Sequence, residues 1–204
     1  MEVISTDHDP FVIGVLSDTH IPDRVRHLHP ALLNLLREQR VDLILHGGDV
    51  SVRSVLAELE SVAPVRAVTG NRDLLLLNDT PITRLLMING VRLVLTHGHL
   101  NPGTYWRDKF LYITRGYNFE RYQKRLVRAF PEADVILFGH THHAENRWIG
   151  KTLFFNPGSV SHGDFIDPQP KYGLLKIAKD GRIDAQIIPL TGARIEHNEW
   201  VETT

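Results

Sequence analysis

The 204-residue chain contains no cysteine. This absence excludes a disulfide framework, a thiolate zinc site, an iron–sulfur cluster and a cysteine nucleophile. It is consistent with a reducing compartment. A core of this size needs no disulfide or structural metal to hold a fold, and the length corresponds to one domain over residues 1–204.

An excess of one charge and long apolar runs are missing as well. Lys and Arg number 23 against 24 Asp and Glu, and the formal net charge of −1 excludes a generally basic protein that coats nucleic acid. No apolar run approaches the roughly 20 residues that span a bilayer, and the polar residues 1–10 do not have the pattern of a signal peptide. We therefore expect a soluble, cytoplasmic protein without a membrane partner.

The first half of the sequence alternates between short apolar runs and amphipathic stretches. The β-branched, apolar runs over 11–17, 41–45 and 65–69 are typical of buried strands. A helix is expected after Pro30, and a second one begins at Ser51, as its N-cap. This β-α-β-α-β order predicts parallel strands joined by right-handed crossovers.

The second half is richer in strands. The pair Asn89-Gly90 between two apolar runs predicts a hairpin. Further short strands are expected at 134–138, 147–149, 152–155, 172–177 and 184–189. The predicted fold class is α/β, most simply two packed sheets with helices outside.

The stretch over residues 101–130 differs from the rest of the chain. It holds eight of the sixteen aromatic residues, and seven basic residues against two acidic ones give it a local charge of +5. Phe119, Tyr122, Leu126 and Ala129 would share one face of a helix. Two interpretations of this insertion remain open: a lid or substrate platform that stacks a base and binds phosphates, or a surface helix that packs inward or forms a homodimer interface.

Five segments combine a position just after an apolar strand with side chains that bind metals. They are Asp18-Thr19-His20, Gly47-Gly48-Asp49, Gly70-Asn71-Arg72-Asp73, Thr96-His97-Gly98-His99 and Gly139-His140-Thr141-His142. Because ligands bind beyond the carboxyl ends of strands in an open α/β sheet, we expect these residues at one edge. A single such segment is commonly a turn or a helix cap. Five of them in the same position favour a metal site.

The spacing within these segments predicts how the side chains converge. In an extended segment, residues i and i+2 point the same way. The pairs with this spacing are Asp18 and His20, His97 and His99, and His140 and His142. The donors are carboxylate, amide and imidazole, without sulfur, a set that suits Mn²⁺, Fe, Zn²⁺ or Ni²⁺.

Together these segments resemble a known family. Asp18-x-His20, Gly48-Asp49, Gly70-Asn71, His97 and Gly139-His140-x-His142, in this order, are similar to the motifs of the calcineurin-like metallophosphoesterases. The similarity continues into Asn156-Pro157-Gly158-Ser159, which resembles the small prokaryotic phosphodiesterase branch of that superfamily. It implies a four-layer αββα sandwich of two mixed β-sheets flanked by helices, with a two-metal site.

The resemblance also implies which residues hold the metals. Asp18, His20, Asp49 and His142 would bind one divalent ion, and Asp49, Asn71, His97 and His140 the other, so that Asp49 bridges. Two cations ~3.5–4 Å apart clamp a phosphoryl group and lower the pKa of a bridging water, so a metal-bridging hydroxide is the expected nucleophile. Manganese is the first expectation for both ions, with nickel, zinc or iron as alternatives.

The sequence departs from the broader superfamily just after Asn71. Many members carry there a histidine that is thought to protonate the leaving group, whereas this chain has Arg72, which stays charged and is suited to hold a phosphate oxygen. His99 is the best replacement acid, with a supporting or merely exposed histidine as the alternative. Asp73 would orient His99 or a ligand, or else cap the next turn.

The predicted function is hydrolysis of a phosphodiester substrate, with a nucleotide as one candidate. A phosphomonoesterase or a nucleotide pyrophosphatase would use the same metal residues and remains an alternative. A protein-binding scaffold, like the retromer subunit that resembles this family, is another. All seven ligand positions carry metal-competent residues, which favours an enzyme. No Gly-x-Ser-x-Gly motif of a serine hydrolase occurs in the sequence.

Overall fold

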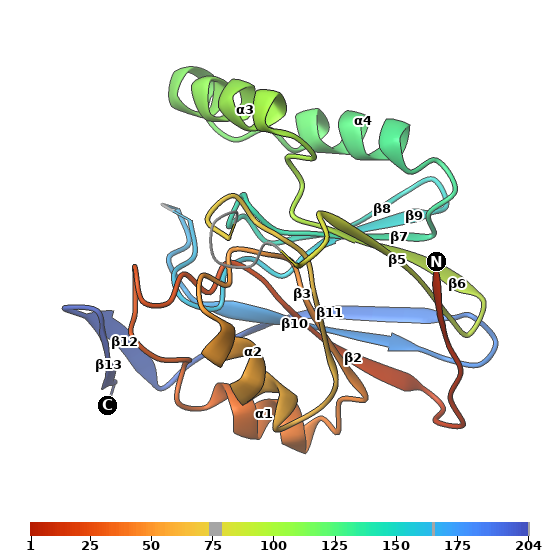
Figure 1. Ribbon diagram of the computed structural model, residues 1–204, viewed down its shortest axis with the longest axis horizontal. Helices are drawn as coiled ribbons and strands as arrows, with labels where there is room; N and C mark the ends of the chain where they lie inside the picture. Colours follow the sequence, from red (N-terminus) through yellow and green to blue (C-terminus); the bar gives the residue numbers. More distant parts are fainter. Residues whose placement is uncertain (74–78, 165, 204) are drawn as a thin grey trace.

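The computed structural model describes residues 1–73, 79–164 and 166–203. Two large β-sheets lie face to face, with helices α1 and α2 beyond one sheet and α3 and α4 beyond the other (Figure 1). The predicted α/β class and the four-layer αββα arrangement are therefore confirmed. None of the helices in the described ranges is long and apolar enough to cross a membrane.

The five-stranded sheet contains the parallel strands of the first half. Its order is β11 (Ile183–Pro189), β10 (Lys171–Ile177), β2 (Phe11–Leu16), β3 (Leu43–His46) and β4 (Val65–Ala67). The helices α1 (Leu32–Glu38) and α2 (Arg53–Glu60) connect β2 to β3 and β3 to β4. Both strand pairs are parallel, which confirms the predicted β-α-β-α-β opening.

The six-stranded sheet is built mainly from the middle of the chain. Its order is β1 (Glu2–Ile4), β5 (Thr83–Ile88), β6 (Val91–Thr96), β7 (Val135–Phe138), β9 (Thr152–Asn156) and β8 (Glu145–Ile149). Positive φ values of 49° at Asn89 and 78° at Gly90 form the predicted tight turn between β5 and β6. The sequence interpretation missed β1 and the terminal hairpin of β12 (Ala193–Glu196) and β13 (Glu199–Glu202).

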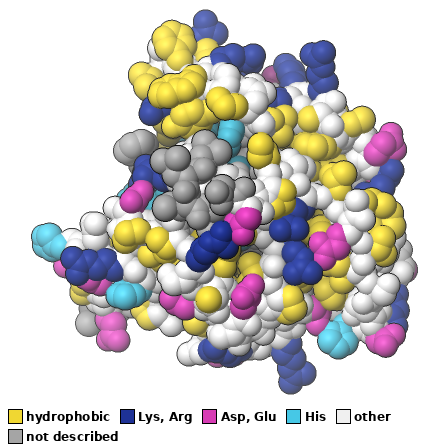
Figure 2. Space-filling model, in the orientation of Figure 1, with side chains coloured by type: hydrophobic (Ala, Val, Ile, Leu, Met, Phe, Trp, Pro, Cys, Tyr) yellow, Lys and Arg dark blue, Asp and Glu magenta, His cyan; other side chains and the backbone are white. Residues whose placement is uncertain are grey.

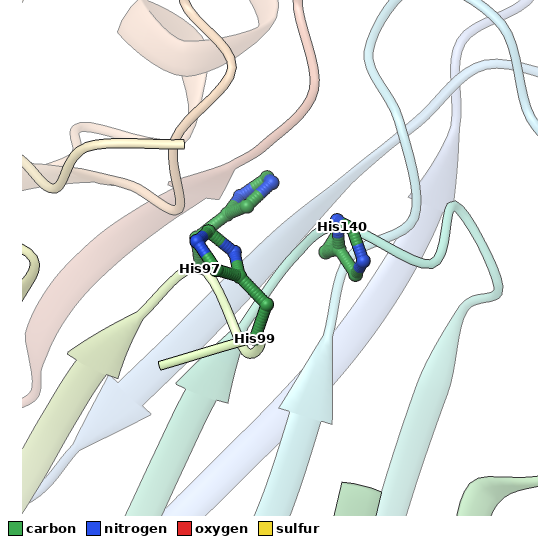
Figure 3. A group of neighbouring side chains, drawn as sticks. All are labelled: His97, His99 and His140. Carbon is green, nitrogen blue, oxygen red and sulfur yellow. The ribbon is translucent and has the colours of Figure 1, made fainter. Parts of the chain in front are cut away.

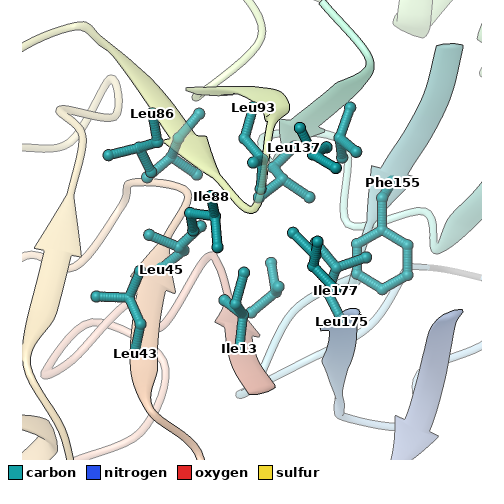
Figure 4. Packing of buried hydrophobic residues seen from close by; sticks show 14 of the residues in the cluster. Ile13, Leu43, Leu45, Leu86, Ile88, Leu93, Leu137, Phe155, Leu175 and Ile177 are labelled. Atoms are coloured by element: carbon teal, nitrogen blue, oxygen red, sulfur yellow. The ribbon is translucent and has the colours of Figure 1, made fainter. Parts of the chain in front are cut away.

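The core has one layer between the sheets and one beneath each pair of helices. Strand β2 shows how one run serves two layers: Ile13 and Val15 join the cluster between the sheets, whereas Leu16 joins the cluster under α1 and α2. Figure 4 shows the layer between the sheets, to which Leu45 contributes from the five-stranded sheet and Phe155 from the six-stranded sheet. Each fully buried side chain of this kind contributes about 1.5–3 kcal/mol.

Residues 101–130 form two helices, α3 (Pro102–Arg115) and α4 (Phe119–Ala129). Helix α4 buries Phe119, Tyr122 and Leu126 against the six-stranded sheet, as the inward-packing interpretation predicts. Ala129 was also expected on this face and is exposed instead, because it lies in the last turn of α4. Helix α3 was not predicted as a separate element.

The expected N-cap of α2 was wrong. Val52 in extended conformation precedes the helix, and Ser51 has a left-handed φ of 72°. The backbone N–H of Ser51 donates to Asp73 at 2.8 Å, so the loop after Asp49 is held by contacts with the candidate site. Because this contact fixes Ser51 in a left-handed conformation, the helix begins one residue later, with Val52 as its N-cap.

Candidate metal centre

The predicted metal ligands gather at one end of the sandwich. Asp18 follows β2, Asp49 follows β3 and Asn71 follows β4, all in the five-stranded sheet. His97 and His140 follow β6 and β7 of the other sheet. The side chains therefore meet across two sheets, and not along one sheet edge as the sequence alone suggested.

Asp18, His20 and His142 form the first donor group. His20 Nε2 lies 3.1 Å from His142 Nε2, and Asp18 Oδ1 lies 3.4 Å from His142 Nε2 and 3.8 Å from His20 Nε2. Donor atoms held by one ion at about 2.1 Å are roughly 3.0–3.4 Å apart in octahedral or tetrahedral geometry. Two of the three distances lie in this range, and the third, between Asp18 Oδ1 and His20 Nε2, is longer at 3.8 Å, so a small shift of His20 would complete a site for one divalent ion.

Asn71, His97 and His140 form the second donor group. Asn71 Oδ1 lies 3.2 Å from His97 Nε2 and 3.0 Å from His140 Nδ1. Figure 3 shows His97 and His140 side by side beyond their strands, with His99 next to them. Amide oxygen and imidazole nitrogen at these separations are a second set of donors for a divalent ion.

Asp49 lies between the two groups with one oxygen toward each. Its Oδ2 is 3.8 Å from His20 Nε2, and its Oδ1 is 3.6 Å from His97 Nε2. The backbone N–H of Arg72 donates to Oδ1 at 2.8 Å and fixes the carboxylate plane. This geometry fits a carboxylate shared by two ions.

Two histidines are oriented by backbone carbonyls. His97 Nδ1 is 2.7 Å from the Gly47 carbonyl, and His142 Nδ1 is 2.9 Å from the His162 carbonyl. A carbonyl only accepts, so each Nδ1 carries the proton and each Nε2 presents its lone pair to its donor group. Both rings are thus held in the tautomer that a metal ligand needs.

The carboxylate of Asp18 is also held in place by hydrogen bonds, which leave one of its oxygens free for a ligand. Its Oδ2 accepts from the Ser17 hydroxyl at 2.6 Å and from the backbone N–H of His140 at 3.0 Å. Its buried Oδ1 has no hydrogen-bond partner among the described residues and faces the first donor group. Buried oxygens rarely remain unsatisfied, and a cation would supply the missing partner.

Burial and mutual repulsion keep most of the histidines neutral. Burial, partly opposed by Asp18, lowers the pKa of His20 to about 3. Burial and the neighbouring His97 also lower the pKa of His140. At the Asp18–His142 pair, burial alone would raise the pKa of Asp18 and lower that of His142. The attraction between the two charges outweighs burial, so the pKa of Asp18 falls and that of His142 rises. His20 and His140 are thus in the neutral form that binds metal, and Asp18 is in the ionised form, whereas metal binding at His142 would release the proton that Asp18 favours there.

Five of the seven predicted ligands have left-handed backbone. The residues, with φ between 51° and 72°, are Asp18, His20, Asp49, His140 and His142. The expectation of extended i, i+2 pairs is therefore wrong for Asp18–His20 and for His140–His142, and the last two side chains point into different groups. Each such non-glycine residue costs about 1–3 kcal/mol and persists only where surrounding contacts enforce it.

Asp73 braces the loops that carry Asp49 and Asn71. Its carboxylate accepts from the backbone N–H groups of Ser51 and Gly70, both at 2.8 Å, and of Val50 at 3.3 Å. These bonds match the predicted turn-capping role better than the orientation of His99.

Arg72 and His99 occupy different surroundings. The Arg72 side chain lines the pocket and forms an ion pair with Asp23. His99 is buried beside His97 and His140, and burial together with His97 lowers its pKa to about 4. A neutral His99 at pH 7 favours a supporting role, or that of an additional metal donor, over a general acid.

Side chains outside the seven predicted ligands support the first donor group, and Ser161 among them escaped the sequence interpretation. The hydroxyls of Ser159 and Ser161 donate to the Asp18 carbonyl at 2.8 and 3.1 Å. His46 Nε2 lies 2.6 Å from the Thr19 hydroxyl, beneath the first donor group. The sequence Ser159-Val160-Ser161, two hydroxyls with strand-like spacing after the Asn-Pro-Gly turn, was the available signal.

A pocket of about 340 Å³ opens over the two donor groups. His20, Asp49, Asn71, His140 and His142 form its floor. Arg24, Arg72 and residues of α3 and α4 form its walls. The arrangement can place an anionic ligand against both donor groups at once.

The chain belongs to the calcineurin-like phosphoesterase superfamily, whose domain matches residues 11–180. A probable metallophosphoesterase of Methanothermobacter thermautotrophicus is 37% identical over 185 residues, which cover 90% of this chain and 95% of that protein. A phosphodiesterase of Methanocaldococcus jannaschii is 25% identical over 182 residues, 82% of this chain and 93% of that protein. Vps29 of Entamoeba histolytica, solved as a zinc complex, aligns with a TM-score of 0.65 and 22% identity over 88% of this chain and 99% of that one.

The predicted family is thus confirmed. Membership indicates a metal-dependent hydrolase of phosphoesters, and the Asp and His groups described above supply donors for divalent metal. The likeness to Vps29 establishes the fold.

Proposed function

We propose that this protein is a phosphodiesterase with a dinuclear metal centre held by Asp18, His20, Asp49, Asn71, His97, His140 and His142. The observation that carries the proposal is the position of Asp49, with one oxygen toward each donor group. When bound, two divalent ions polarise the phosphoryl oxygens and lower the pKa of a water. Manganese is the first candidate, with nickel, zinc or iron as alternatives.

The residues of the chain itself bind and orient the substrate. Arg72 lies at the pocket wall, where its guanidinium is placed to exchange its Asp23 partner for a phosphate oxygen. Arg24 adds a second cation to the same wall. His99 supports His97 and His140 from below, and Asp73 keeps the loops of Asp49 and Asn71 in register.

Hydrolysis of matched diester and monoester substrates tests this proposal. Wild-type protein loaded in turn with Mn²⁺, Ni²⁺, Zn²⁺ and Fe²⁺ is assayed with bis(4-nitrophenyl) phosphate and 4-nitrophenyl phosphate. We expect a higher kcat/KM for the diester. A preference for the monoester would establish the phosphomonoesterase alternative, and hydrolysis of neither would contradict an enzymatic role.

A protein-binding scaffold of the Vps29 type is the second candidate, because the fold is shared. That relative was itself solved with zinc, so metal binding alone does not distinguish the two functions. Catalytic turnover distinguishes them. The Asp49→Asn variant should lose about 100- to 1,000-fold in kcat/KM, a loss typical for removal of one electrostatic group from an active site. Asp184→Asn, on exposed β11, is the matched control and should keep full activity.

A further inference from the structure

Helix α3 covers one side of the pocket without packing into the core. Asp108 is its only buried residue, whereas Trp106, Phe110 and Ile113 are 64%, 66% and 75% exposed. Hydrophobic side chains gather on the surface over α3, at the top of the view in Figure 2. Apolar burial therefore does not explain where this helix lies.

Polar contacts hold α3 in place. The buried Asp108 forms an ion pair of 2.7 Å with Arg125 of α4, and the Arg125 guanidinium lies 4.9 Å from the centre of the Tyr122 ring. At its start, Asn101 Oδ1 accepts from the backbone N–H of Thr104 at 3.0 Å, and the Thr104 hydroxyl bonds to the His99 carbonyl. The helix is tied to the metal-binding segment at one end and to α4 in its middle.

The face of α3 that lines the pocket combines aromatic and charged side chains. Its lining residues are Tyr105, Asp108, Lys109, Tyr112 and Ile113. Their spacing of three and four residues places them on one side of the helix. Because Arg125 neutralises Asp108, this wall offers two phenol rings, an apolar side chain and one cation. The Tyr105 ring centre is 5.7 Å from that of His140, so the wall begins directly at the donor groups.

We propose that this wall binds a nucleoside, or a similar planar aromatic group, esterified to the phosphate. Tyr105 and Tyr112 contact the flat face of the ring, and Lys109 lies beside an oxygen of the phosphoester. Aromatic walls beside a cation bind bases irrespective of their identity. This inference rests on the proposed phosphodiesterase function and names its substrate class.

Two substrates with the same leaving group test the wall. Thymidine 5′-(4-nitrophenyl phosphate) and methyl 4-nitrophenyl phosphate both release 4-nitrophenol, and only the first carries a base. Wild type should prefer the thymidine diester by about tenfold or more in kcat/KM. The variant Tyr112→Leu should lose about 5- to 100-fold on the thymidine diester, mainly through KM, and less than twofold on the methyl diester.

Matched variants separate this effect from misfolding. Tyr112→Phe keeps the ring and should restore most of the thymidine preference. Phe110→Leu makes an equivalent change on the exposed side of the same helix and should alter neither substrate. Equal kcat/KM for the two substrates in wild type, or equal losses on both in Tyr112→Leu, would overturn the inference and leave the phosphodiesterase intact.

Binding provides a readout that does not depend on turnover. Thymidine 5′-monophosphate should bind wild type at least about tenfold more tightly than methyl phosphate in calorimetry, and Tyr112→Leu should remove that difference. If wild type hydrolyses neither diester, the phosphodiesterase proposal fails. The binding ratio still decides on the wall, because equal affinities for the two phosphates would contradict it.

Discussion

The backbone at the donor residues is strained, and hydrogen bonds to buried side chains hold it. Asp18, His20 and Asp49 all have left-handed φ values. The carboxylate of Asp73 holds the loop that follows Asp49 through two backbone N–H groups and the neighbouring loop through that of Gly70. Such strain persists where surrounding contacts over-determine the conformation. The position of the donors is therefore a property of their supporting bonds.

The substitution Asp73→Asn tests this support at a single residue. The amide keeps the size of the carboxylate but turns an N–H group toward backbone donors, so buried N–H groups lose their acceptor. We expect the free energy of unfolding to fall by about 1–3 kcal/mol and the affinity for Mn²⁺ to fall about 10- to 100-fold. Urea denaturation and metal titration measure the two effects. Unchanged metal affinity would show that Asp73 stabilises only its own turn.

The sequence predicted which residues cluster at the candidate site but not their backbone conformation. Residue type and position after a strand were enough to single out Asp18, Asp49 and His97. These residues come together because the ends of their strands meet where the two sheets pack. Left-handed φ at Asp18 and His20 results from long-range contacts such as the bonds from Ser159 and Ser161 to the Asp18 carbonyl. These bonds join residues that are 141 and 143 positions apart, so no pattern around Asp18 encodes its backbone conformation.

Among the elements, the loop after β3 and the loop after β4 approach each other so closely that Gly70 has no room for a side chain. A Cβ atom on Gly70 would overlap the backbone nitrogen and Oδ1 of Asp49. The substitution Gly70→Ala should therefore displace Asp49, lower the free energy of unfolding by about 1–3 kcal/mol and reduce Mn²⁺ binding. Thermal unfolding and metal titration with the variant measure both.

Gly103 in the first turn of α3 offers the matched control. A Cβ atom there meets only Asn101 Oδ1, at 3.4 Å. We expect Gly103→Ala to keep the stability and the metal affinity of wild type. If Gly70→Ala behaved like Gly103→Ala, the close approach of the two loops would not be what positions Asp49.

Helices α3 and α4 show why one element was predicted and the other was not. The spacing of Phe119, Tyr122 and Leu126 is that of a helix with a buried face, and α4 has that face. In α3 the buried residue is the charged Asp108, whereas Trp106 and Phe110 are exposed, so burial periodicity gave no signal. The capping box of Asn101 and Thr104, with Pro102 at the first position, was the local sign of its start.

At the scale of the whole molecule, ion pairs between distant segments contribute to stability. Arg92 at the start of β6 binds Asp134, just before β7, through its side chain and its backbone N–H. The hydrogen bond from Arg92 lowers the pKa of Asp134 from its ordinary value of 3.8. The pair therefore stabilises the fold above pH 3.8, and this contribution is lost as the pH falls further toward the folded-state pKa.

The variant Asp134→Asn tests this pH dependence. The difference in free energy of unfolding between wild type and variant should be largest near pH 6 and should shrink as the pH falls below 3.8. Urea denaturation of both proteins at pH 6 and at a pH below 3.8 measures this difference, with Asp184→Asn as a surface control. A difference that stayed constant with pH would mean that the ionised pair does not contribute.

The layered fold followed from the sequence because two-sided burial of strands such as β2 leaves few other arrangements. Strand β1 escaped prediction because it has only three residues and is held by pairing with the distant β5, at the edge of the six-stranded sheet. The dimer interface remains a prediction, and the exposed Trp106 and Phe110 on α3 are where it would lie.

The proposed dinuclear centre requires that Asp49 is shared by two metal ions. Anomalous diffraction from crystals of the wild-type protein grown with Mn²⁺ tests it most directly. We predict two manganese peaks per chain, ~3.5–4 Å apart, with the Asp49 carboxylate in contact with both. A single peak, or two peaks of which only one contacts Asp49, would contradict the account.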